Sequence, residues 1–592
     1  MSRLDDRLSA LSPQKRRLVD MLLKREEAAA ASFVAPASAL EESLAEIWSQ
    51  VLGLKRVGAQ DNFIALGGDS IRAIQISARA RKGGLSFTAD QCFRQPTIRQ
   101  LAAFLEQQSL HTGGVPPPRR SEQVPTVLSF GEERIWLEHQ IRDDVPVYNT
   151  FMAVRIDGPL QVEVLIKAMH ALLQRHDTLR TAYRQEKGEL RRVILPDLQP
   201  QLSIVEGESA ESLPEEARLQ QLAREETQKA FDLTQAPLLR CTLVRLSSQP
   251  HRHYLILTAH HIICDAWSMG ILLVELTRLY EAFVNRLPSP LVPLDIGYAE
   301  FAQWQRDVVG SGRLAEQLAY WRTVLQHSPL EPVLPSPRPR PTVRSYRGRT
   351  SFFQLPPEVL ASIDRFAKGQ RVTRYIACLA AYFLVIHSYS KRSDLVVGTP
   401  VLGRPLEETE KLVGFFLNTV VLRTRVTADT SIAAFTEQLN EVRTDALRHQ
   451  DIPYDRVLRE LGIERNTAHA PLFQLWFVMQ TGKAETLHAA DLRLTPVELE
   501  RTTSAFDVAL SLQEAEAGLN GWLEYNTDLF DEAFMRQFQG RYELVLQQLE
   551  SAVSSSVGEI LESVVSREVV AGRRLRDELR QRVKQFAPDL NG

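Results

Sequence analysis

The sequence predicts more than one domain and a combination of helices with strands. At 592 residues the chain exceeds what one hydrophobic core usually holds. Ile71, Ile74 and Ile76 give a mixed helical stripe, whereas Tyr254–Ala259 is a short apolar run typical of a buried strand. The proline-rich stretch Gly113–Arg120 lies between the two patterns and predicts a short semi-rigid linker. We therefore expect at least two domains, one on each side of this linker, with both helices and strands in the chain.

Composition excludes several classes of function. A net charge of −3 with 44% hydrophobic residues describes a soluble globular protein without a basic field for nucleic acid. The longest apolar run, about Tyr375–Ile386, is too short to span a bilayer, and the N-terminus lacks a signal-peptide core. We expect a cytoplasmic protein with no nucleic-acid or membrane partner. The cysteines have neither disulfide nor zinc spacing, which predicts reduced thiols and no metal site: Cys92, Cys241, Cys264 and Cys378.

The run Asp61–Ile71 is the most informative stretch. Gly67 and Gly68 permit a sharp turn, and Ser70 then opens a helix predicted over Ser70–Ala80. Free amide groups and the helix dipole tolerate a phosphodiester at such a position. A plain Gly-Gly turn with a capping Asp-Ser pair is the structural alternative. A final helix is predicted over Ile98–Glu106.

From about residue 36 to 108 the chain resembles a peptidyl carrier protein of nonribosomal peptide synthetases. The resemblance implies a small four-helix bundle and a covalent 4′-phosphopantetheine on Ser70, attached by a phosphopantetheinyl transferase. Asp69, directly before this serine, is a residue that often occurs in carriers paired with an epimerization domain.

A second constellation follows the predicted strand Tyr254–Ala259. The string His260–Ser268 begins with two adjacent histidines, and adjacent strand residues point to opposite faces, so only one histidine enters a given cavity. The string resembles the His-His-x-x-x-Asp-Gly motif of condensation domains and related chloramphenicol acetyltransferase-like acyltransferases. The resemblance implies that His261 faces the reaction channel, that His260 is structural, and that Asp265 orients the site.

Six further stretches match condensation-domain signatures in order along residues 125 to about 555. They are Ser129–Leu137, Arg175–Thr181, Tyr298–Trp304, Val413–Thr419, His449–Asp455 and Pro471–Gln474. The implied fold is an α/β (α+β) domain of two chloramphenicol acetyltransferase-like lobes in a V shape, with a channel between them. Within these matches Trp136, Trp304 and Phe473 are expected in the core.

Epimerization domains share the histidine string, but their Glu-Gly-His-Gly-Arg-like loop does not occur here. Tyr148-Asn149 slightly favours an L-configured donor by resemblance.

The resemblance implies an amide-forming acyltransferase. A thioester on the Ser70 arm would meet an amine from another carrier, with His261 accepting a proton or holding the amine. Backbone amides after Asp265 are the nearest oxyanion donors, and Asn418 is a weaker candidate. The resemblance also predicts a buried ion pair between Arg180 and Asp265. The implied partners are other synthetase modules or carrier proteins and an adenylation enzyme acting in trans or upstream.

One departure and two alternatives stay open. Ala266 replaces the final glycine of the motif, which keeps the amide but restricts positive φ. The domain could form an ester or use a soluble amine, or it could be a catalytically silent docking scaffold.

The predicted segments are a helical linker or docking segment (1–35), the carrier (36–110), a linker (111–124), two lobes (125–290 and 291–555) and a helical tail (556–592). Amphipathic helices are expected at 3–28 and 558–586.

Overall fold

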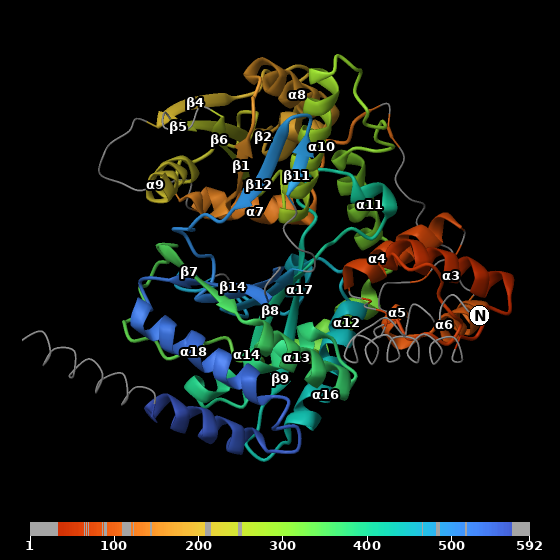
Figure 1. Cartoon of the computed structure of the whole chain (residues 1–592), viewed down its shortest axis with the longest axis vertical. Helices are drawn as coiled ribbons and strands as arrows, with labels where there is room; N and C mark the ends of the chain where they lie inside the picture. Colours follow the sequence, from red (N-terminus) through yellow and green to blue (C-terminus); the bar gives the residue numbers. More distant parts are fainter. Residues whose placement is uncertain are drawn as a thin grey trace, which may run out of the picture. The chain divides into compact units, whose positions relative to one another are not determined.

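The computed structural model describes residues 33–108 and 120–570, with internal gaps at 64–65, 67, 69, 84, 86, 88–90, 122, 142–144, 208–214, 247–250, 465, 481–485 and 516–517. The chain divides into two units, Met1–Gly114 and Val115–Gly592 (Figure 1). The predicted helix at 3–28, most of the linker at 111–124 and the tail beyond residue 570 lie outside the described residues. A described helix at 557–570 begins the predicted tail.

The first unit is helical. Its described helices are α3 (Ala39–Leu52), α4 (Ser70–Lys82), α5 (Gln91–Arg94) and α6 (Ile98–Gln108). The Ser38 hydroxyl caps α3 by accepting from the Glu41 N–H, and Gly53 ends this helix in the left-handed region. Trp48 of α3 packs edge-on against Phe63 with ring centroids 5.1 Å apart, and both side chains are fully buried. The helices predicted from Ser70 and from Ile98 are confirmed, and each extends two residues further than expected.

The first lobe of the second unit contains a six-stranded mixed sheet in the order β11-β12-β1-β6-β5-β4 and a two-stranded sheet, β2-β3. The predicted buried strand is confirmed as β6. The elements are α7 (Phe130–Ile141), η1 (Pro146–Tyr148), β1 (Asn149–Asp157), α8 (Val162–Arg175), η2 (Asp177–Arg180), β2 (Thr181–Glu186), β3 (Glu189–Ile194), β4 (Leu202–Gly207), α9 (Glu215–Thr227), β5 (Leu239–Leu246), β6 (Arg252–His260) and α10 (Ala266–Val284).

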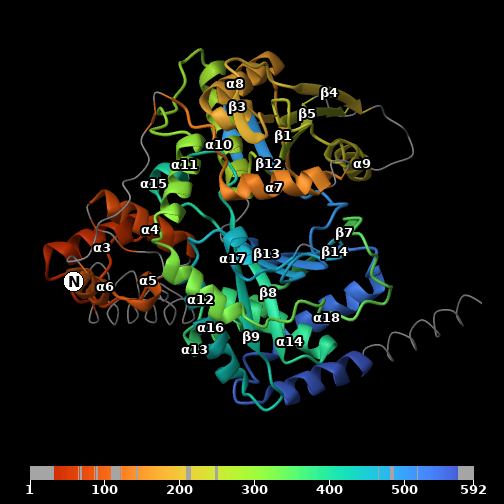
Figure 2. The same cartoon turned by 180° about the vertical axis from the view of Figure 1, so that it is seen from behind.

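Two strands of this sheet come from much later in the chain. β12 (Leu492–Val497) pairs antiparallel with β1, and β11 (Leu487–Ala489) pairs with β12. The two blue strands lie beside the ochre and olive strands of the first lobe in both views (Figure 1, Figure 2). The predicted division at residue 290 did not anticipate this crossover, because local patterns do not reveal which distant strand completes a sheet.

The second lobe contains the six-stranded mixed sheet β7-β14-β13-β10-β8-β9, in which β10 runs parallel to both β8 and β13. The elements from residue 298 onward are α11 (Tyr298–Gly310), α12 (Ala315–Leu325), β7 (Gly348–Leu355), α13 (Pro357–Gln370), α14 (Arg374–Ser390), β8 (Asp394–Val401), α15 (Glu407–Glu410), β9 (Asn418–Arg425), α16 (Ile432–Arg448), α17 (Tyr454–Glu460), β10 (Leu475–Gln480), β13 (Val508–Ala515), β14 (Gly518–Asn526) and α18 (Glu532–Gln548).

Helix α14 forms the centre of the second lobe. Its residues from Ile376 to Ile386 are fully buried, which explains why this run is apolar on every face. Within the described residues, no single helix is long and apolar enough to cross a membrane. Helices α13 and α14 together meet that length and composition criterion as a pair bent by 104°.

Candidate active site

His261 lies where the chain leaves β6 and turns toward α10. The strand ends at His260, so His261 is already in the turn rather than on the strand as expected. Its backbone N–H donates to the Tyr148 carbonyl at 2.7 Å, and its ring Nδ1 lies 2.6 Å from the Cys264 carbonyl oxygen. A carbonyl oxygen only accepts, so Nδ1 carries the hydrogen and the neutral ring has its lone pair on Nε2.

The surroundings keep this imidazole neutral. Burial lowers the pKa of His261 from its ordinary value, against the raising effects of the Cys264 carbonyl and Asp265. The ring of Phe415 meets the imidazole edge to face, with centroids 4.9 Å apart. No described residue hydrogen-bonds Nε2, which is therefore available to accept a hydrogen bond or a proton at neutral pH.

His260 faces a different environment. Its side chain is 3% exposed, and its Nδ1 accepts the Ile262 N–H at 3.3 Å. The rings of His139 and Phe231 lie 5.4 and 6.1 Å away, centroid to centroid. Burial lowers the pKa of His260 well below the ordinary value. This packing is consistent with the predicted structural role.

Asp265 orients the start of α10, but its predicted ion-pair partner is wrong. Its carboxylate caps the helix by accepting the Ser268 N–H at 2.8 Å, and it also accepts the Phe416 N–H at 3.1 Å. The arginine that contacts Asp265 is Arg404, at 3.3 Å, with both side chains under 5% exposed.

Arg180 instead pairs with Asp177, three residues before it, at 2.6 Å. Its guanidinium also donates to the carbonyls of Leu173 and Leu195. Leu173 lies in α8 and Leu195 directly follows β3. These nearby acceptors satisfy the Arg180 guanidinium without Asp265. Arg404 follows β8, far along the chain from Asp265, and carried no signal in the sequence.

Ala266 is the first residue of α10 and is exposed. It is not among the described residues with positive φ, so this position does not need glycine's conformational range. The N–H groups of Ala266 and Trp267 have no acceptor among the described residues. They point out of a helix N-terminus and are suited to stabilise a developing oxyanion.

Asn418 does not have a free amide. Its Nδ2 donates to the carbonyls of Gln450 and Ile452, both at 2.8 Å, and its Oδ1 accepts the Tyr454 N–H at 3.0 Å. Both amide hydrogens are therefore used to hold the loop before α17. The prediction of Asn418 as an oxyanion donor is wrong, because sequence position alone cannot show which groups an amide already serves.

A partly buried charged cluster beside the histidine was not anticipated from the sequence. Arg134 of α7 lies 3.3 Å from the carboxylate of Asp455 and 3.9 Å from Glu138, which also accepts the Tyr148 hydroxyl. Burial opposes the charge on Arg134, but Asp455 and Glu138 outweigh it and raise the pKa of the guanidinium. The guanidinium lies 5.8 Å from the Phe415 ring. Two of the sequence motifs, Ser129–Leu137 and His449–Asp455, thus meet at the lobe interface.

Ser70 is the first residue of α4, as expected; Gly67, Asp69 and the Ser70 side chain lie outside the described residues. The chain reaches this helix by crossing the Phe63 ring, where a Cβ at Gly68 would lie 2.4 Å from the ring. Glycine is therefore required for the close approach. A serine at a helix N-terminus fits a phosphodiester, because unpaired N–H groups and the dipole favour the anion.

Other described features bear on the remaining predictions. All four cysteines are free and buried. The described residues contain no group of three or more His, Cys, Asp or Glu side chains that could hold a metal ion. Phe473 is buried in the core of the second lobe, and Trp136 and Trp304 are partly buried against hydrophobic clusters.

Two sequence families match the chain. The profile described as "Condensation domain" matches residues 123–567, and "Phosphopantetheine attachment site" matches residues 42–105. One of the linear gramicidin synthase proteins of Brevibacillus parabrevis is 35% identical over 534 residues, which is 89% of this chain and 10% of that protein. Phosphinothricin tripeptide synthetase PhsC from Streptomyces viridochromogenes is 36% identical over 423 residues, 70% of this chain and 38% of that protein. The chain thus spans a small part of these relatives.

Solved structures share the fold of the second unit. The X-domain in complex with OxyB from teicoplanin biosynthesis has a TM-score of 0.68 at 24% identity and covers 76% of this chain and 98% of its own. The first condensation domain of the CDA synthetase has a TM-score of 0.64 at 22% identity, with 74% and 99% covered.

Proposed function

Because the chain belongs to the condensation-domain family of nonribosomal peptide synthetases and carries a phosphopantetheine attachment domain ahead of it, we propose that it joins an acyl or peptidyl group to an amine. Such domains work with other synthetase modules and carrier proteins. The observation that carries the proposal is the tautomer of His261: Nδ1 is committed to a carbonyl, so Nε2 is a free base in a partly buried site.

When bound at Ser70, 4′-phosphopantetheine supplies the terminal thiol on which the acyl group is held as a thioester. We propose that a phosphopantetheinyl transferase installs it and that an adenylation enzyme, acting in trans or upstream, provides the acyl group. The modification is tested by incubating wild type and Ser70→Ala with coenzyme A and a transferase. We expect the full mass gain in wild type alone; the same gain in Ser70→Ala would refute the assignment.

In the proposed reaction, nitrogen attacks the thioester carbonyl, the C–N bond forms, the C–S bond breaks and the thiol leaves. His261 Nε2 accepts a hydrogen bond or the proton that the amine loses, and that proton is returned to the departing sulfur. The N–H groups of Ala266 and Trp267 donate to the oxygen as charge develops on it. Holding both reactants in one site replaces a bimolecular encounter, which is worth roughly 7–11 kcal/mol at best.

The test is a single-turnover assay with an acyl group on Ser70 and an aminoacyl carrier as acceptor. We expect His261→Ala to lose roughly 10²- to 10⁴-fold in rate while it keeps its fold and its loading. His488→Ala, which removes an exposed histidine on β11, is the matched control and should keep the wild-type rate. Equal rates in all three proteins would remove His261 from the chemistry.

Two other functions give different results in the same assay. If the natural acceptor is a hydroxyl or a soluble amine, product appears with that small molecule and without a second carrier. If the domain is a silent docking scaffold, no acceptor gives product. The free Nε2 of His261 and the unpaired amides of α10 favour an active enzyme over a scaffold.

A further inference from the structure

The loop Val413–Phe416 comes from the second half of the chain, yet it is held by the first lobe. The Thr178 hydroxyl donates to the Val413 carbonyl at 2.8 Å. The Gly414 carbonyl accepts the Ser268 hydroxyl at 2.9 Å. Val413 and Phe415 are buried in the hydrophobic core of the first lobe. This loop is therefore held at successive backbone positions, next to the turn that carries His261.

Tyr298 holds the next position of the loop. Its hydroxyl donates to the Phe415 carbonyl, and its side chain is buried at 2% exposure. Its ring packs edge-on against Phe416 with centroids 4.8 Å apart. A Cβ at Gly414 would lie 2.0 Å from the Tyr298 ring, so glycine is required for the loop to pass this closely.

The Tyr298 hydroxyl is itself held. The Ser129 hydroxyl oxygen lies 2.9 Å from it. Because the Tyr298 hydrogen is used on a carbonyl, which only accepts, the Ser129 hydroxyl must donate to the Tyr298 oxygen. Ser129 also begins α7 in a reciprocal cap: its Oγ accepts the Glu132 N–H, and its own N–H donates to the Glu132 carboxylate at 2.7 Å.

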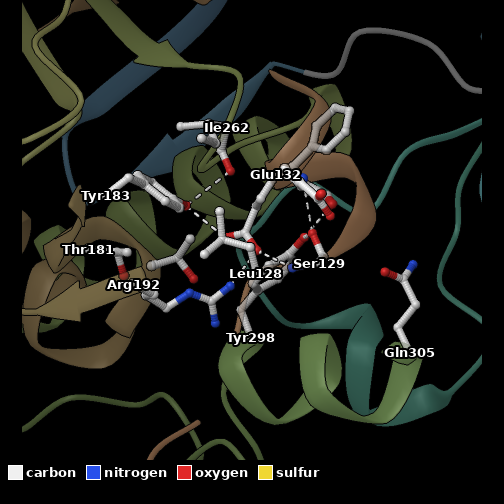
Figure 3. Close-up of polar contacts among 12 residues, drawn as sticks. Leu128, Ser129, Glu132, Thr181, Tyr183, Arg192, Ile262, Tyr298 and Gln305 are labelled. Atoms are coloured by element: carbon white, nitrogen blue, oxygen red, sulfur yellow. Dashed lines mark hydrogen bonds and ion pairs between the residues drawn. The ribbon is translucent and has the colours of Figure 1, made fainter. Parts of the chain in front are cut away.

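Glu132 anchors this series of hydrogen bonds in the core (Figure 3). The carboxylate is 0% exposed and pairs with Arg192, whose side chain is 2% exposed, while the Tyr183 hydroxyl donates to the carboxylate at 2.7 Å. A buried carboxylate with an ion pair and several donors has little freedom to move, because any displacement leaves a buried polar group unpaired.

The far end of the series is the ring of Phe415. One side of this ring meets the His261 imidazole at 4.9 Å and 83°, and another lies against the backbone of Gly131, where a Cβ would come within 2.6 Å. We propose that Tyr298 is a positioning residue, which sets the Phe415 ring against His261 through its hydrogen bond to the Phe415 carbonyl. This role rests on the function proposed for His261, and Tyr298 itself is not assigned any contact with substrate.

The hydroxyl alone is tested by Tyr298→Phe, which keeps the ring and its packing. The matched control is Tyr542→Phe, which removes an equally buried hydroxyl that donates to the Cys378 carbonyl at 3.2 Å in the core of the second lobe. Both proteins are labelled with ¹³Cε1-histidine, and the His261 signal is assigned from its absence in His261→Gln. An aromatic ring shifts the resonance of a group held against it, so the signal reports on the Phe415 ring.

We expect the His261 resonance to move in Tyr298→Phe and to stay at its wild-type position in Tyr542→Phe. Ser129→Ala leaves the hydrogen bond from Tyr298 to the Phe415 carbonyl, but removes the hydroxyl that donates to Tyr298 and accepts the Glu132 N–H at the start of α7. This variant should move the resonance in the same direction by less. It also serves if Tyr298→Phe does not fold. An unmoved resonance in both Tyr298→Phe and Ser129→Ala would overturn the proposal.

In the single-turnover assay, Tyr298→Phe should lower the rate roughly 10- to 100-fold at saturating acceptor, with an unchanged half-saturating concentration. Tyr542→Phe should keep the wild-type rate. A wild-type rate in Tyr298→Phe would overturn the positioning role even if His261→Ala is inactive. If His261→Ala retains full rate, the proposed function of that histidine fails, and the resonance comparison still decides whether Tyr298 places the Phe415 ring.

Discussion

Arg404→Met tests the corrected partner of Asp265. The Arg404 side chain is 1% exposed, and its guanidinium donates to the Asp265 carboxylate at 3.3 Å and to the Ser268 hydroxyl at 2.8 Å. It also donates to the carbonyls of Thr409 and Leu412. Methionine keeps most of the side-chain volume and removes the charge and every one of these donors.

The loss in stability follows from what remains buried. Asp265 would keep the Ser268 and Phe416 amides as donors but lose its only charged contact among the described residues. Removing one partner of a buried ion pair destabilises a protein by about 3–5 kcal/mol. We expect the free energy of unfolding of the second unit to fall by about that amount, and part of it should return in Arg404→Met with Asp265→Asn, which removes the unpaired charge.

The measurement is denaturant-dependent hydrogen exchange of the full chain, read on peptides from α10. Arg365→Met is the control, because its pair with Glu550 is on the surface and its loss should not be measurable. Arg404→Met, Asp265→Asn and their combination form a double-mutant cycle. The same cycle is measured with Arg180→Met in place of Arg404→Met. A coupling of Asp265 with Arg180, or an Arg404→Met as stable as Arg365→Met, would refute the reasoning.

Three further predictions concern single residues. Ala266→Gly should keep the wild-type rate and lose at most about 1 kcal/mol of stability, since the position is helical; a faster variant would contradict this. Asn418→Ala should lose about 1–3 kcal/mol and speed hydrogen exchange at 449–455, whereas a rate loss at unchanged stability would restore Asn418 as an oxyanion donor. Burial holds the pKa of His260 below that of an unfolded histidine, which is about 6.5. As the pH falls through that value, the unfolded chain binds more protons than the folded chain, so the free energy of unfolding decreases. His260→Gln should flatten this slope by up to about 1.4 kcal/mol per pH unit in urea titrations between about pH 7 and pH 5, and an unchanged slope would place the protons elsewhere.

The sequence predicted those parts of the site that lie together along the chain. His261, Asp265 and the start of α10 fall within a few residues, so the strand, the turn and the cap could be read as one pattern. Ser70 could be placed in the same way, because two glycines and a helix start are local features. The two α/β lobes and the small helical bundle followed from the resemblance.

Contacts between distant segments could not be read in this way. Arg180 lies in a recognised motif, whereas Arg404 lies in none. Only the folded chain shows that Asp177 and nearby carbonyls satisfy Arg180 and that Arg404 contacts Asp265. Asn418 has the right functional group for an oxyanion donor, but the loop at 450–454 uses it fully. The residue type determines which hydrogen bonds and ion pairs a side chain is able to make. The groups around it in the folded chain determine which of these it actually makes.

The crossover of β11 and β12 has a consequence for how the protein is made. Until β12 leaves the ribosome, β1 has β6 on one side and an open edge on the other. Synthesis at roughly 5–20 residues per second leaves that edge unpaired for many seconds after β1 itself has emerged. Open strand edges are sites of aggregation. Translation speed and chaperone access between β6 and β12 should therefore decide how much of the nascent protein reaches its native sheet.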